Sequence, residues 1–591
     1  MNIEYVLQEN IEQALKALYE VEDKVQLQPT RKDFEGNYTY VVFPLVKQLK
    51  KSPAEIGNAI GNYLLENSSV VTRFNVVQGF LNLVLAESVW LETLAGIFED
   101  KSFGNLPKNG KSVMVEFSSP NTNKPLHLGH LRNNFLGDSV SRILAANGFE
   151  VVKTSIVNDR GVHICKSMLA YQLFANGETP ESAGIKGDHL AGKYYVEFDK
   201  AYKKEIEELV AGGMSEDDAK KNAPMMKATQ EMLIKWEQGD AETLALWRKM
   251  NDWVFAGFND TYKKIGVSFD KVYYESNTYI LGKDIVEDGL EKGVFFKKED
   301  GSVWIDLSAE KLDEKLVLRS DGTSVYMTQD LGTTDLKFKD FGNDKSIWVV
   351  GNEQEYHFQV LFAIMKHLGR SYANDCFHLS YGMVDLPSGK MKSREGTVVD
   401  ADDLVAEMIE TAEATTRERG KIDDFSNEEA QTLFNTLALG ALKYYLLKVE
   451  PKKRMLFNPQ ESIDFQGNTG PFIQYTHARI RSILRKAADQ QFSFGEAVPQ
   501  VDLHPIEIEL IYLLSEYPNV IKKAGDEYAP SFVANYCYDL AKTFNSFYAE
   551  LSVMNEENIE KKKLRLILVQ LIAETLKKGM GLLGVDVPER M

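Results

Sequence analysis

The sequence is poor in the residues that build disulfide-rich and zinc-binding proteins. Its three cysteines, Cys165, Cys376 and Cys537, stand far apart and form no CxxC pair. A disulfide framework or a cysteine-based zinc site is therefore not expected, and a reducing cytoplasm is the natural compartment. There is no HExxH motif either, so the sequence predicts no metal site.

Long apolar runs are also missing. No stretch reaches membrane-spanning length, and the N-terminal MNIEYVLQENIEQAL is acidic and amphipathic, unlike a signal peptide. Internal repeats and low-complexity tracts are absent. With 591 residues, 44% of them hydrophobic and 26% charged, the composition is typical of a folded soluble protein with several domains. We expect a cytoplasmic protein with no membrane partner.

Positive charge is in deficit, since 68 Lys and Arg face 87 Asp and Glu and give a net charge of −19. This balance argues against a general nucleic-acid coat. The deficit is uneven, however, because residues 451–591 hold 17 basic and 18 acidic residues. Within that segment, PFIQYTHARIRSILRK (471–486) has four basic residues and no acid. Charges more than about 8 Å apart are largely screened at physiological salt, so the acidic total does not exclude RNA.

Hydrophobic periodicity predicts a βαβ unit in the first half of the chain. VMVEFSS (113–119) is typical of a buried strand, a helical pattern follows and stops at Asn147-Gly148, and VVKTSIVND (151–159) is the next strand. This order predicts a parallel sheet. Three later strand-like runs are expected to complete that sheet: 302–307, 346–350 and 376–384.

The flanking segments predict further domains. Residues 1–108 are typical of a small α/β unit that ends in a Gly- and Lys-rich linker. The parallel-sheet domain is expected over 109–400, with a polar helical insertion at about 175–240. From residue 401 the pattern is nearly all helical, and we divide it into a connector (401–455) and a helical bundle (456–591).

An unusual pair of histidines follows the first strand of the βαβ unit. His127, Gly129 and His130 form an H-x-G-H motif within SSPNTNKPLHLGHLRNN (118–134), in a chain with only nine histidines. In doubly wound sheets, ligands bind beyond the carboxyl ends of strands, and helix N-termini attract phosphate. Glycine lets a ligand approach the backbone, and imidazoles can donate to phosphate oxygens as charge builds on them. Surface or capping histidines are the less favoured interpretation.

Three other segments carry candidate chemistry. SGKMKSREGTVVD (388–400) is a basic loop that could grip a triphosphate, although its composition also suits a solvated surface loop. Tyr326 and Asp330 are four residues apart, on one face of a helix expected to begin near Thr323-Ser324. Phenol and carboxylate groups suit a guanidinium, but Asp330 alone would more often be a solvated helix residue.

The third candidate lies in the basic stretch of the tail. Phe472, Tyr475 and Arg479 fall at i, i+3 and i+7 of a predicted helix and therefore share one face. Aromatic rings stack on unpaired bases, and arginine contacts phosphate. A core stripe with solvated basic residues outside it is the alternative.

An H-x-G-H turn on a parallel sheet marks class I aminoacyl-tRNA synthetases and small nucleotidyltransferases. VEFSSPNTNKPLHLGHLRNNFLGD (115–138) resembles the corresponding block of arginyl-tRNA synthetases. Further blocks resemble the same family in the same order: SVYMTQDLGTTDL (324–336), WVVGNEQEYHFQVL (348–361) and LLGVDVPERM (582–591). The resemblance implies a Rossmann-type catalytic domain, an added N-terminal domain that touches the tRNA elbow, and a C-terminal all-α anticodon-binding bundle. The segment at about 175–240 is least covered.

The resemblance also implies roles for individual residues. His127, Gly129, His130, Met391 and Lys392 would contact ATP. Arginine would be held by a set of polar side chains: Glu116, Asn121, His127, Tyr326, Asp330 and Gln354. The anticodon region would contact Phe472, Tyr475, Arg479 and Met591. Tyr38 and Tyr40 are possible contacts to the elbow, whereas five aromatic residues are expected in the core: Tyr536, Tyr538, Phe544, Phe547 and Tyr548.

The basic loop departs from the pattern of its class. It occupies the place of the KMSKS loop, but Ser393 replaces the second lysine, while Lys390, Lys392 and Arg394 remain as cations. In arginyl-tRNA synthetases with this departure, a lysine just before H-x-G-H is thought to compensate, and Lys124 stands there. Which of these cations neutralises most of the phosphate charge stays open.

The resemblance implies ATP-dependent activation of L-arginine and its transfer to tRNA(Arg), with Mg-ATP as a substrate and no tightly bound cofactor. A monomer is expected. Three alternatives remain: a small-molecule nucleotidyltransferase, a different class I synthetase, and a tRNA-binding paralogue that has lost catalysis. The first would not need about 190 further helical residues, and the second would not need a site suited to a cation.

Overall fold

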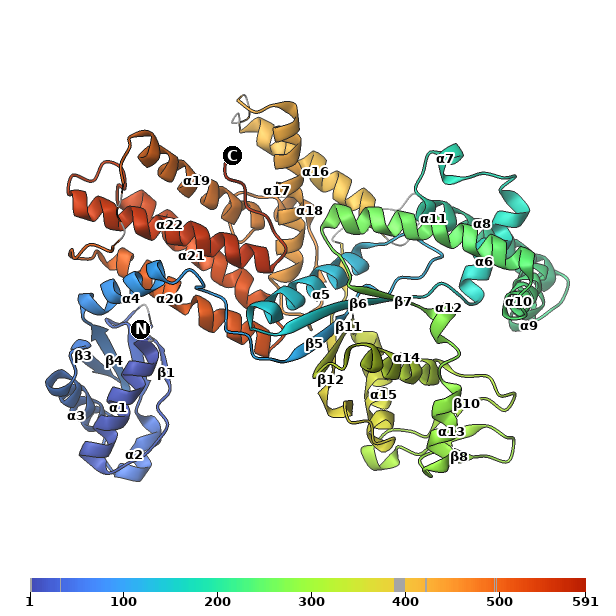
Figure 1. Cartoon of the computed structure of the whole chain (residues 1–591), viewed down its shortest axis with the longest axis horizontal. Helices are drawn as coiled ribbons and strands as arrows, with labels where there is room; N and C mark the ends of the chain where they lie inside the picture. Colours follow the sequence, from blue (N-terminus) through green and yellow to red (C-terminus); the bar gives the residue numbers. More distant parts are fainter. Residues whose placement is uncertain are drawn as a thin grey trace.

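The computed structural model describes residues 3–31, 33–386, 399–419, 422, 424–493, 495 and 497–591. Figure 1 shows an elongated molecule with the N-terminal unit at one end, the helices of the insertion at the other, and the parallel sheet between them. Among the described residues, no helix is both long and apolar enough to span a membrane.

The central sheet has, in the described residues, five strands in the order β12-β11-β5-β6-β7, and each neighbouring pair is parallel. These strands are β5 (Ser112–Glu116), β6 (Glu150–Val157), β7 (Lys271–Tyr274), β11 (Lys345–Gly351) and β12 (Cys376–Tyr381). Val113, Met114 and Val115 are at most 1% exposed, because β5 is covered on both faces. The strand order reverses between β5 and β11, which is where such sheets bind ligands. The predicted Rossmann-type sheet is confirmed.

Two details of the predicted sheet were wrong. The run at 302–307 holds β9 (Val303–Ile305), which lies between β8 (Phe296–Lys297) and β10 (Lys315–Leu318) in a separate antiparallel sheet. Val303 and Ile305 are buried and Trp304 between them is half-buried, an alternation typical of a sheet packed on one face. The edge strand β7, by contrast, is too short and too polar at its ends to have been recognised.

Helix α5 (Leu128–Ala146) follows β5 and ends before Asn147-Gly148, as the sequence predicts. The connection between β6 and β7 is mainly helical and includes the segment at about 175–240 that was expected as an insertion. Its helices are α6 (Val162–Phe174), α7 (Pro180–Ala183), α8 (Gly187–Ala211), α9 (Glu216–Asn222), α10 (Pro224–Glu237) and α11 (Ala241–Ile265). Four helices follow around the second half of the sheet: α12 (Glu275–Thr278), α13 (Lys283–Glu291), α14 (Tyr326–Phe341) and α15 (Glu355–His367).

The N-terminal unit is an antiparallel sheet, β1-β2-β4-β3, covered by helices. Its elements are α1 (Ile3–Tyr19), β1 (Leu27–Pro29), β2 (Tyr38–Val41), α2 (Phe43–Leu49), α3 (Pro53–Asn67), β3 (Val71–Val77), β4 (Phe80–Leu85) and α4 (Glu87–Glu99). Helix α4 leads from this unit to the rest of the molecule (Figure 1).

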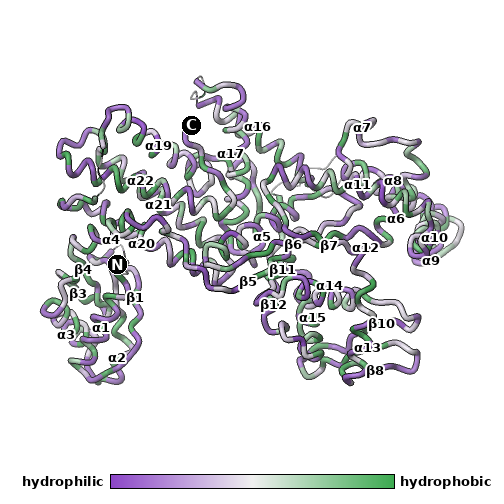
Figure 2. Tube along the Cα trace, in the orientation of Figure 1, coloured by the Kyte–Doolittle hydropathy of each residue, from purple (hydrophilic) through white to green (hydrophobic). Residues whose placement is uncertain are grey.

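The C-terminal part is helical, as predicted. It consists of α16 (Ala401–Glu418), α17 (Asn427–Leu447), α18 (Pro459–Ser462), α19 (Gly470–Asp489), α20 (Pro505–Asp526), α21 (Ser531–Glu550) and α22 (Ile559–Leu582). A short strand, β14 (Met455–Leu456), pairs with β13 (Val384–Asp385). Hydrophobic residues recur along these helices between hydrophilic ones (Figure 2), and α17, α20 and α22 pack against α5. The bundle is therefore docked on the helix that begins at H-x-G-H.

Candidate active site

The backbone turns sharply where β5 ends. Ser118 and Ser119 have φ angles of 79° and 46°, in the left-handed region that non-glycine residues rarely adopt. The Ser118 amide donates to Asn133 Oδ1 (2.5 Å), and the Ser118 hydroxyl lies 2.7 Å from the Tyr262 hydroxyl. These bonds hold a costly conformation in place. The turn brings Ser119 to the wall of a cavity beyond the sheet.

The two motif histidines meet at the N-terminus of α5. His127 is the N-cap residue, and its Nδ1 accepts a hydrogen bond from the Gly129 amide (3.1 Å). His130 Nδ1 accepts one from the His127 amide (3.1 Å), and the two ring centroids are 3.8 Å apart. Because each Nδ1 is an acceptor, the proton of each neutral ring is on Nε2. Both Nε2–H groups therefore remain as donors for a ligand.

Electrostatics keep these rings neutral. Burial and the charge of Lys124 lower the pKa of His127 to about 4. Burial, together with the charges of His127 and Lys124, also holds the pKa of His130 well below its usual value. Lys124 is half-buried, and burial lowers its own pKa. The site thus combines two neutral donors with one nearby ammonium.

The segment that follows the basic loop adjoins the same motif. Lys390, Met391, Lys392, Ser393 and Arg394 lie outside the described residues. The segment that follows the loop pairs with the motif: the Leu128 amide donates to the Val399 carbonyl (2.9 Å) and the Ala401 amide to the Leu126 carbonyl (3.0 Å). His127 and Asp400 form the antiparallel bridge between these two bonds.

A cavity of about 500 Å³ lies beyond β5, β6 and β11. Four of the residues predicted to bind arginine line it: Glu116, Tyr326, Asp330 and Gln354. Asn121 and His127 are not among its described lining residues. Asn121 is exposed and forms a backbone bridge to Asn158, which does line the cavity. The structure therefore brings four of the six predicted residues together at one cavity.

One face of α14 supplies a wall of this cavity. Tyr326 is 62% exposed at the start of the helix, and Asp330 lies one turn further on. Asp330 Oδ2 is 2.6 Å from His357 Nε2. At the deeper end, the buried carboxylate of Glu116 is ion-paired with the buried ammonium of Lys337.

The sequence interpretation missed His357 and Lys337. Lys337 is seven residues after Asp330, and the same helical spacing that linked Tyr326 to Asp330 could have found it. His357 comes from α15, and no local spacing relates it to Asp330. Only the tertiary fold brings the two side chains together.

A third carboxyl group lies near Asp330. Burial and the charges of Asp159 and Asp330 raise the pKa of Glu275 to about 7, although Arg160 opposes this shift. The Arg160 guanidinium lies 4.0 Å from the centre of the Tyr279 ring and bonds Glu237 (2.7 Å). Asp330 lines the cavity and Glu275 lies near it, and two neighbouring carboxyl groups suit a cationic ligand.

The predicted anticodon residues form a half-buried surface on α19. Phe472 packs against Tyr538, with ring centroids 5.5 Å apart. The Arg479 guanidinium lies over the rings of Tyr475 (4.8 Å) and Tyr548 (5.4 Å). Tyr548 is 43% exposed, so its prediction as a core residue was wrong. The other four aromatic residues predicted for the core are buried or half-buried, and Met591 is half-buried against the core.

Tyr38 and Tyr40 are buried, at 3% and 7% exposure, so they cannot be open contacts for RNA. The Tyr38 ring packs edge-on against Tyr512 of α20 (5.6 Å between centroids). The alternation of strand β2 could not reveal this, because both faces of the strand are covered. Tyr38 instead joins the N-terminal unit to the helical bundle.

Three family profiles match successive parts of the chain. "tRNA synthetases class I (R), catalytic domain" matches residues 94–458. "DALR anticodon binding domain" matches residues 473–591, and "Arginyl tRNA synthetase N terminal domain" matches residues 5–85.

Similar proteins span the whole chain. Arginine–tRNA ligases of Amoebophilus asiaticus and Bacteroides fragilis are each 56% identical to it, with full coverage of both chains. The solved arginyl-tRNA synthetase of Thermus thermophilus has a TM-score of 0.81 at 26% identity, again covering all of both chains. The chain belongs to the arginyl-tRNA synthetases, a family of class I aminoacyl-tRNA synthetases.

Proposed function

We propose that the chain ligates L-arginine to the 3′-terminal adenosine of tRNA(Arg) in two steps driven by ATP. One observation carries the proposal: β5 ends at a cavity lined by Glu116 and Asp330, and the chain that leaves this strand leads to two neutral imidazole donors at the N-terminus of α5. The carboxyl groups suit the guanidinium of arginine. The imidazole donors and the helix N-terminus suit phosphate.

In the first step, a carboxylate oxygen of arginine attacks the α-phosphorus of Mg-ATP, and the bond to the leaving pyrophosphate breaks. The Nε2–H groups of His127 and His130 donate to oxygens of the transferring phosphate, where negative charge develops. Gly129 leaves room for the nucleotide at the backbone. Lys124 neutralises the leaving pyrophosphate from one side, and the loop residues Lys390, Met391, Lys392 and Arg394 contact it from the other.

In the second step, the 2′-hydroxyl of the terminal adenosine attacks the carbonyl carbon of arginyl-adenylate, and AMP leaves. The ester forms as the mixed anhydride breaks, so no covalent enzyme intermediate is required. The hydroxyl proton departs with the phosphate or with water.

Arginine recognition is assigned to both ends of the substrate. Asp330 pairs with the guanidinium, and Tyr326 lies beside it. Asn121, His127 and Gln354 hold the α-amino and carboxylate groups. Glu116 is ion-paired with Lys337, so it contributes a hydrogen-bond acceptor more than a net charge.

Binding of tRNA involves all parts of the chain. Phe472, Tyr475, Arg479 and Met591 contact the anticodon region, and the N-terminal unit faces the elbow. The domain limits expected from the sequence belong to this proposal: 1–108, 109–400, 401–455 and 456–591. The enzyme acts as a monomer in the cytoplasm.

Pyrophosphate exchange into ATP, measured with each of the twenty amino acids with and without total tRNA, tests the proposal. Exchange with arginine alone, dependent on tRNA, is the expected result. Exchange with another amino acid would contradict the assignment of Tyr326 and Asp330 to the guanidinium of arginine. No exchange under any condition would overturn the proposed activity.

A further inference from the structure

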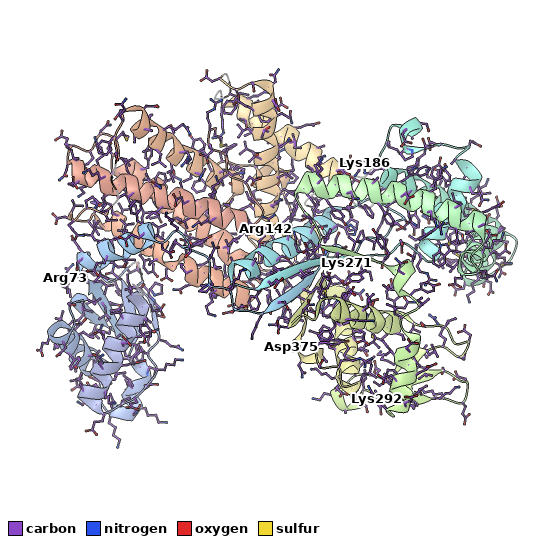
Figure 3. The ribbon with its side chains drawn as sticks, viewed as in Figure 1. Arg73, Arg142, Lys186, Lys271, Lys292 and Asp375 are labelled. Carbon is purple, nitrogen blue, oxygen red and sulfur yellow. The ribbon has the colours of Figure 1, made fainter. Side chains whose placement is uncertain are left out.

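A half-buried cluster of charges joins the insertion to the segment after the basic loop. Lys186, the residue before α8, places its ammonium 2.6 Å from Asp402 Oδ2 and 2.6 Å from the Thr261 hydroxyl. His189 Nε2 lies 3.3 Å from Asp402 Oδ2 and 3.4 Å from Asp400 Oδ2. Figure 3 shows Lys186 where the insertion helices approach α16. Neither Lys186 nor His189 has a part in the chemistry proposed above.

The cluster holds a segment that pairs with the catalytic motif. Asp400 caps α16 by accepting from the amides of Asp402 and Asp403. Its backbone also forms the bridge to His127, flanked by the two hydrogen bonds of residues 399–401 to residues 126–128. A displacement of Asp400 would therefore move the backbone of His127.

Helix α8 also touches the other side of the motif loop. A Cβ atom on Gly192 would lie 2.9 Å from Pro125 Cδ and 3.7 Å from the Cα of Lys124. Helix α8 thus packs directly on the residues that precede H-x-G-H. The same helix contacts the motif through Gly192 and through the charge cluster.

The cluster resembles a metal site in composition, because ligand atoms of Asp188, His189 and Asp402 lie within 4.8 Å of one another. Lys186 occupies the position that a cation would take, 2.6 Å from Asp402 and 3.4 Å from Asp188. The Lys186 ammonium therefore takes the place of a metal ion. The cluster serves as a structural joint, a set of ion pairs that connects the insertion to residues 400–402.

We propose that Lys186 and His189 are positioning residues for adenylate formation, which hold Asp400 and Asp402 so that helix α8 sets the places of Lys124, His127 and His130. This inference rests on the proposed function of those three residues. A shift of about 1 Å in a reacting group can lower a rate about a hundredfold, so a joint of this kind affects the chemical step without touching substrate.

The charges around His189 make the joint depend on pH. Burial favours its neutral form, but Asp402, Asp400 and Asp188 outweigh both burial and Lys186 and raise the pKa of His189. Lys264 of α11 also faces Asp402. Below its raised pKa, His189 is positively charged and paired. As pH rises through that pKa, His189 loses its positive charge. Lys186 is then the remaining cation of the cluster beside Asp188, Asp400 and Asp402.

The test compares variants of α8 in arginine-dependent pyrophosphate exchange with tRNA present. Lys186→Met should lower kcat at least about tenfold, and Lys186→Arg should recover most of it because the charge is kept. Lys193→Met is the matched control, since the Lys193 ammonium of α8 pairs with Glu178 (2.7 Å) and not with a carboxylate of the cluster. It should stay within about twofold of the unmodified enzyme.

The pH profile separates positioning from simple folding. The kcat of the unmodified enzyme should decline as pH rises through the pKa of His189, and His189→Gln should remove this decline. Gly192→Val should lower kcat without changing the pH profile, which keeps the test informative if Lys186→Met does not fold.

The outcomes are distinguishable. If the unmodified enzyme exchanges with arginine but Lys186→Met matches Lys193→Met, or if His189→Gln keeps the alkaline decline, the positioning role is overturned while the activity stands. If the unmodified enzyme shows no exchange, the proposed function itself fails.

Discussion

At the scale of single residues, the two nitrogens of His127 have separate tasks. Nδ1 caps α5 through the Gly129 amide, and Nε2–H is the group proposed to donate to the nucleotide. Asparagine can supply an oxygen close to the position of Nδ1, but it has no group at the position of Nε2. Substitution can therefore separate the structural task from the chemical one.

We predict that His127→Asn keeps the cap and loses catalysis. Exchange activity should fall about 10²–10³-fold, the usual effect of removing one donor to developing charge, while the thermal midpoint changes little. His127→Ala should lose the same activity and also about 0.5–2 kcal/mol of stability, because the cap is gone. Equal midpoints for the two variants, measured by differential scanning fluorimetry, would show that the cap is unimportant.

Asp330 offers a test of charge in the cavity. Asp330→Asn keeps the size and the contact to His357 but removes the negative charge, so arginine binding should weaken by about 2–5 kcal/mol. Isothermal titration calorimetry with L-arginine measures this directly. Asp335→Asn is the control, because Asp335 is on the same helix and bonds Arg370 outside the cavity (2.8 Å). Equal affinities in both variants would contradict the assignment of Asp330.

The raised pKa of Glu275 leads to a prediction of how arginine binding depends on pH. A bound guanidinium favours the ionised carboxylate, and the pKa of Glu275 in the free protein is about 7. Below that pH the group must release a proton on binding, so affinity should be full above pH 7 and fall by up to about tenfold per unit below it. Titrations between pH 6 and 8.5 check this. Glu275→Gln should flatten the profile, and an unchanged slope would count against the role of Glu275.

At the scale of elements, sequence patterns correctly predicted the strands and helices whose formation depends on neighbouring residues. β5, α5 and β6 were predicted because an apolar strand, a helical stripe and an Asn-Gly stop are each readable within a few residues. The place of β9 in a separate sheet, and the burial of Tyr38, depend on which surface packs on which. Such partners are distant in sequence, so periodicity does not reveal them.

The candidate site divides in the same way. H-x-G-H and the Tyr326–Asp330 face were found from spacing and resemblance. The bonds of Asp330 to His357 and of Glu116 to Lys337 join elements that are remote in the chain. The sequence therefore predicts which groups a site contains better than it predicts the partner of each carboxylate.

Arg132 of α5 gives a prediction for an element. It is 1% exposed, and it donates to backbone carbonyls in two segments beside the bundle: Gly382, Met383, Pro451 and Lys453. Arg132→Met would leave these buried acceptors without donors, so the free energy of unfolding should fall by at least about 2 kcal/mol. Urea denaturation measures it.

A matched surface variant serves as the control for Arg132. Arg73 is exposed and paired with Glu35 (2.6 Å), and Figure 3 places it on the N-terminal unit. Arg73→Met should change stability by at most about 1 kcal/mol. If both variants lose the same stability, the buried guanidinium is not a special link between α5 and its neighbours.

At the scale of the whole molecule, the last ten residues connect two functional surfaces. The Leu582 carbonyl accepts from Ser139 of α5 (2.8 Å), and the Gly584 carbonyl accepts from Lys443 of α17 (2.6 Å). Further along, the Asp586 carbonyl accepts from Gln474 of α19 (2.7 Å). The segment is therefore fixed both to the helix that begins at H-x-G-H and to α19, the helix that carries the residues proposed to contact the anticodon region.

The final residues of this segment bond to α19. The Pro588 carbonyl is 3.0 Å from His477 Nδ1, and the Glu589 carbonyl accepts from Arg485 (2.8 Å). We predict that deleting residues 588–591 weakens tRNA binding about tenfold, because α19 loses the contacts that orient its basic face. Arginine affinity should not change, since Leu582 and Gly584 keep their bonds to α5 and α17. Filter binding with tRNA and calorimetry with L-arginine measure the two quantities on one protein. A loss of both would mean that the end of the chain supports the catalytic domain itself, and a loss of neither would remove residues 588–591 from the tRNA-binding surface.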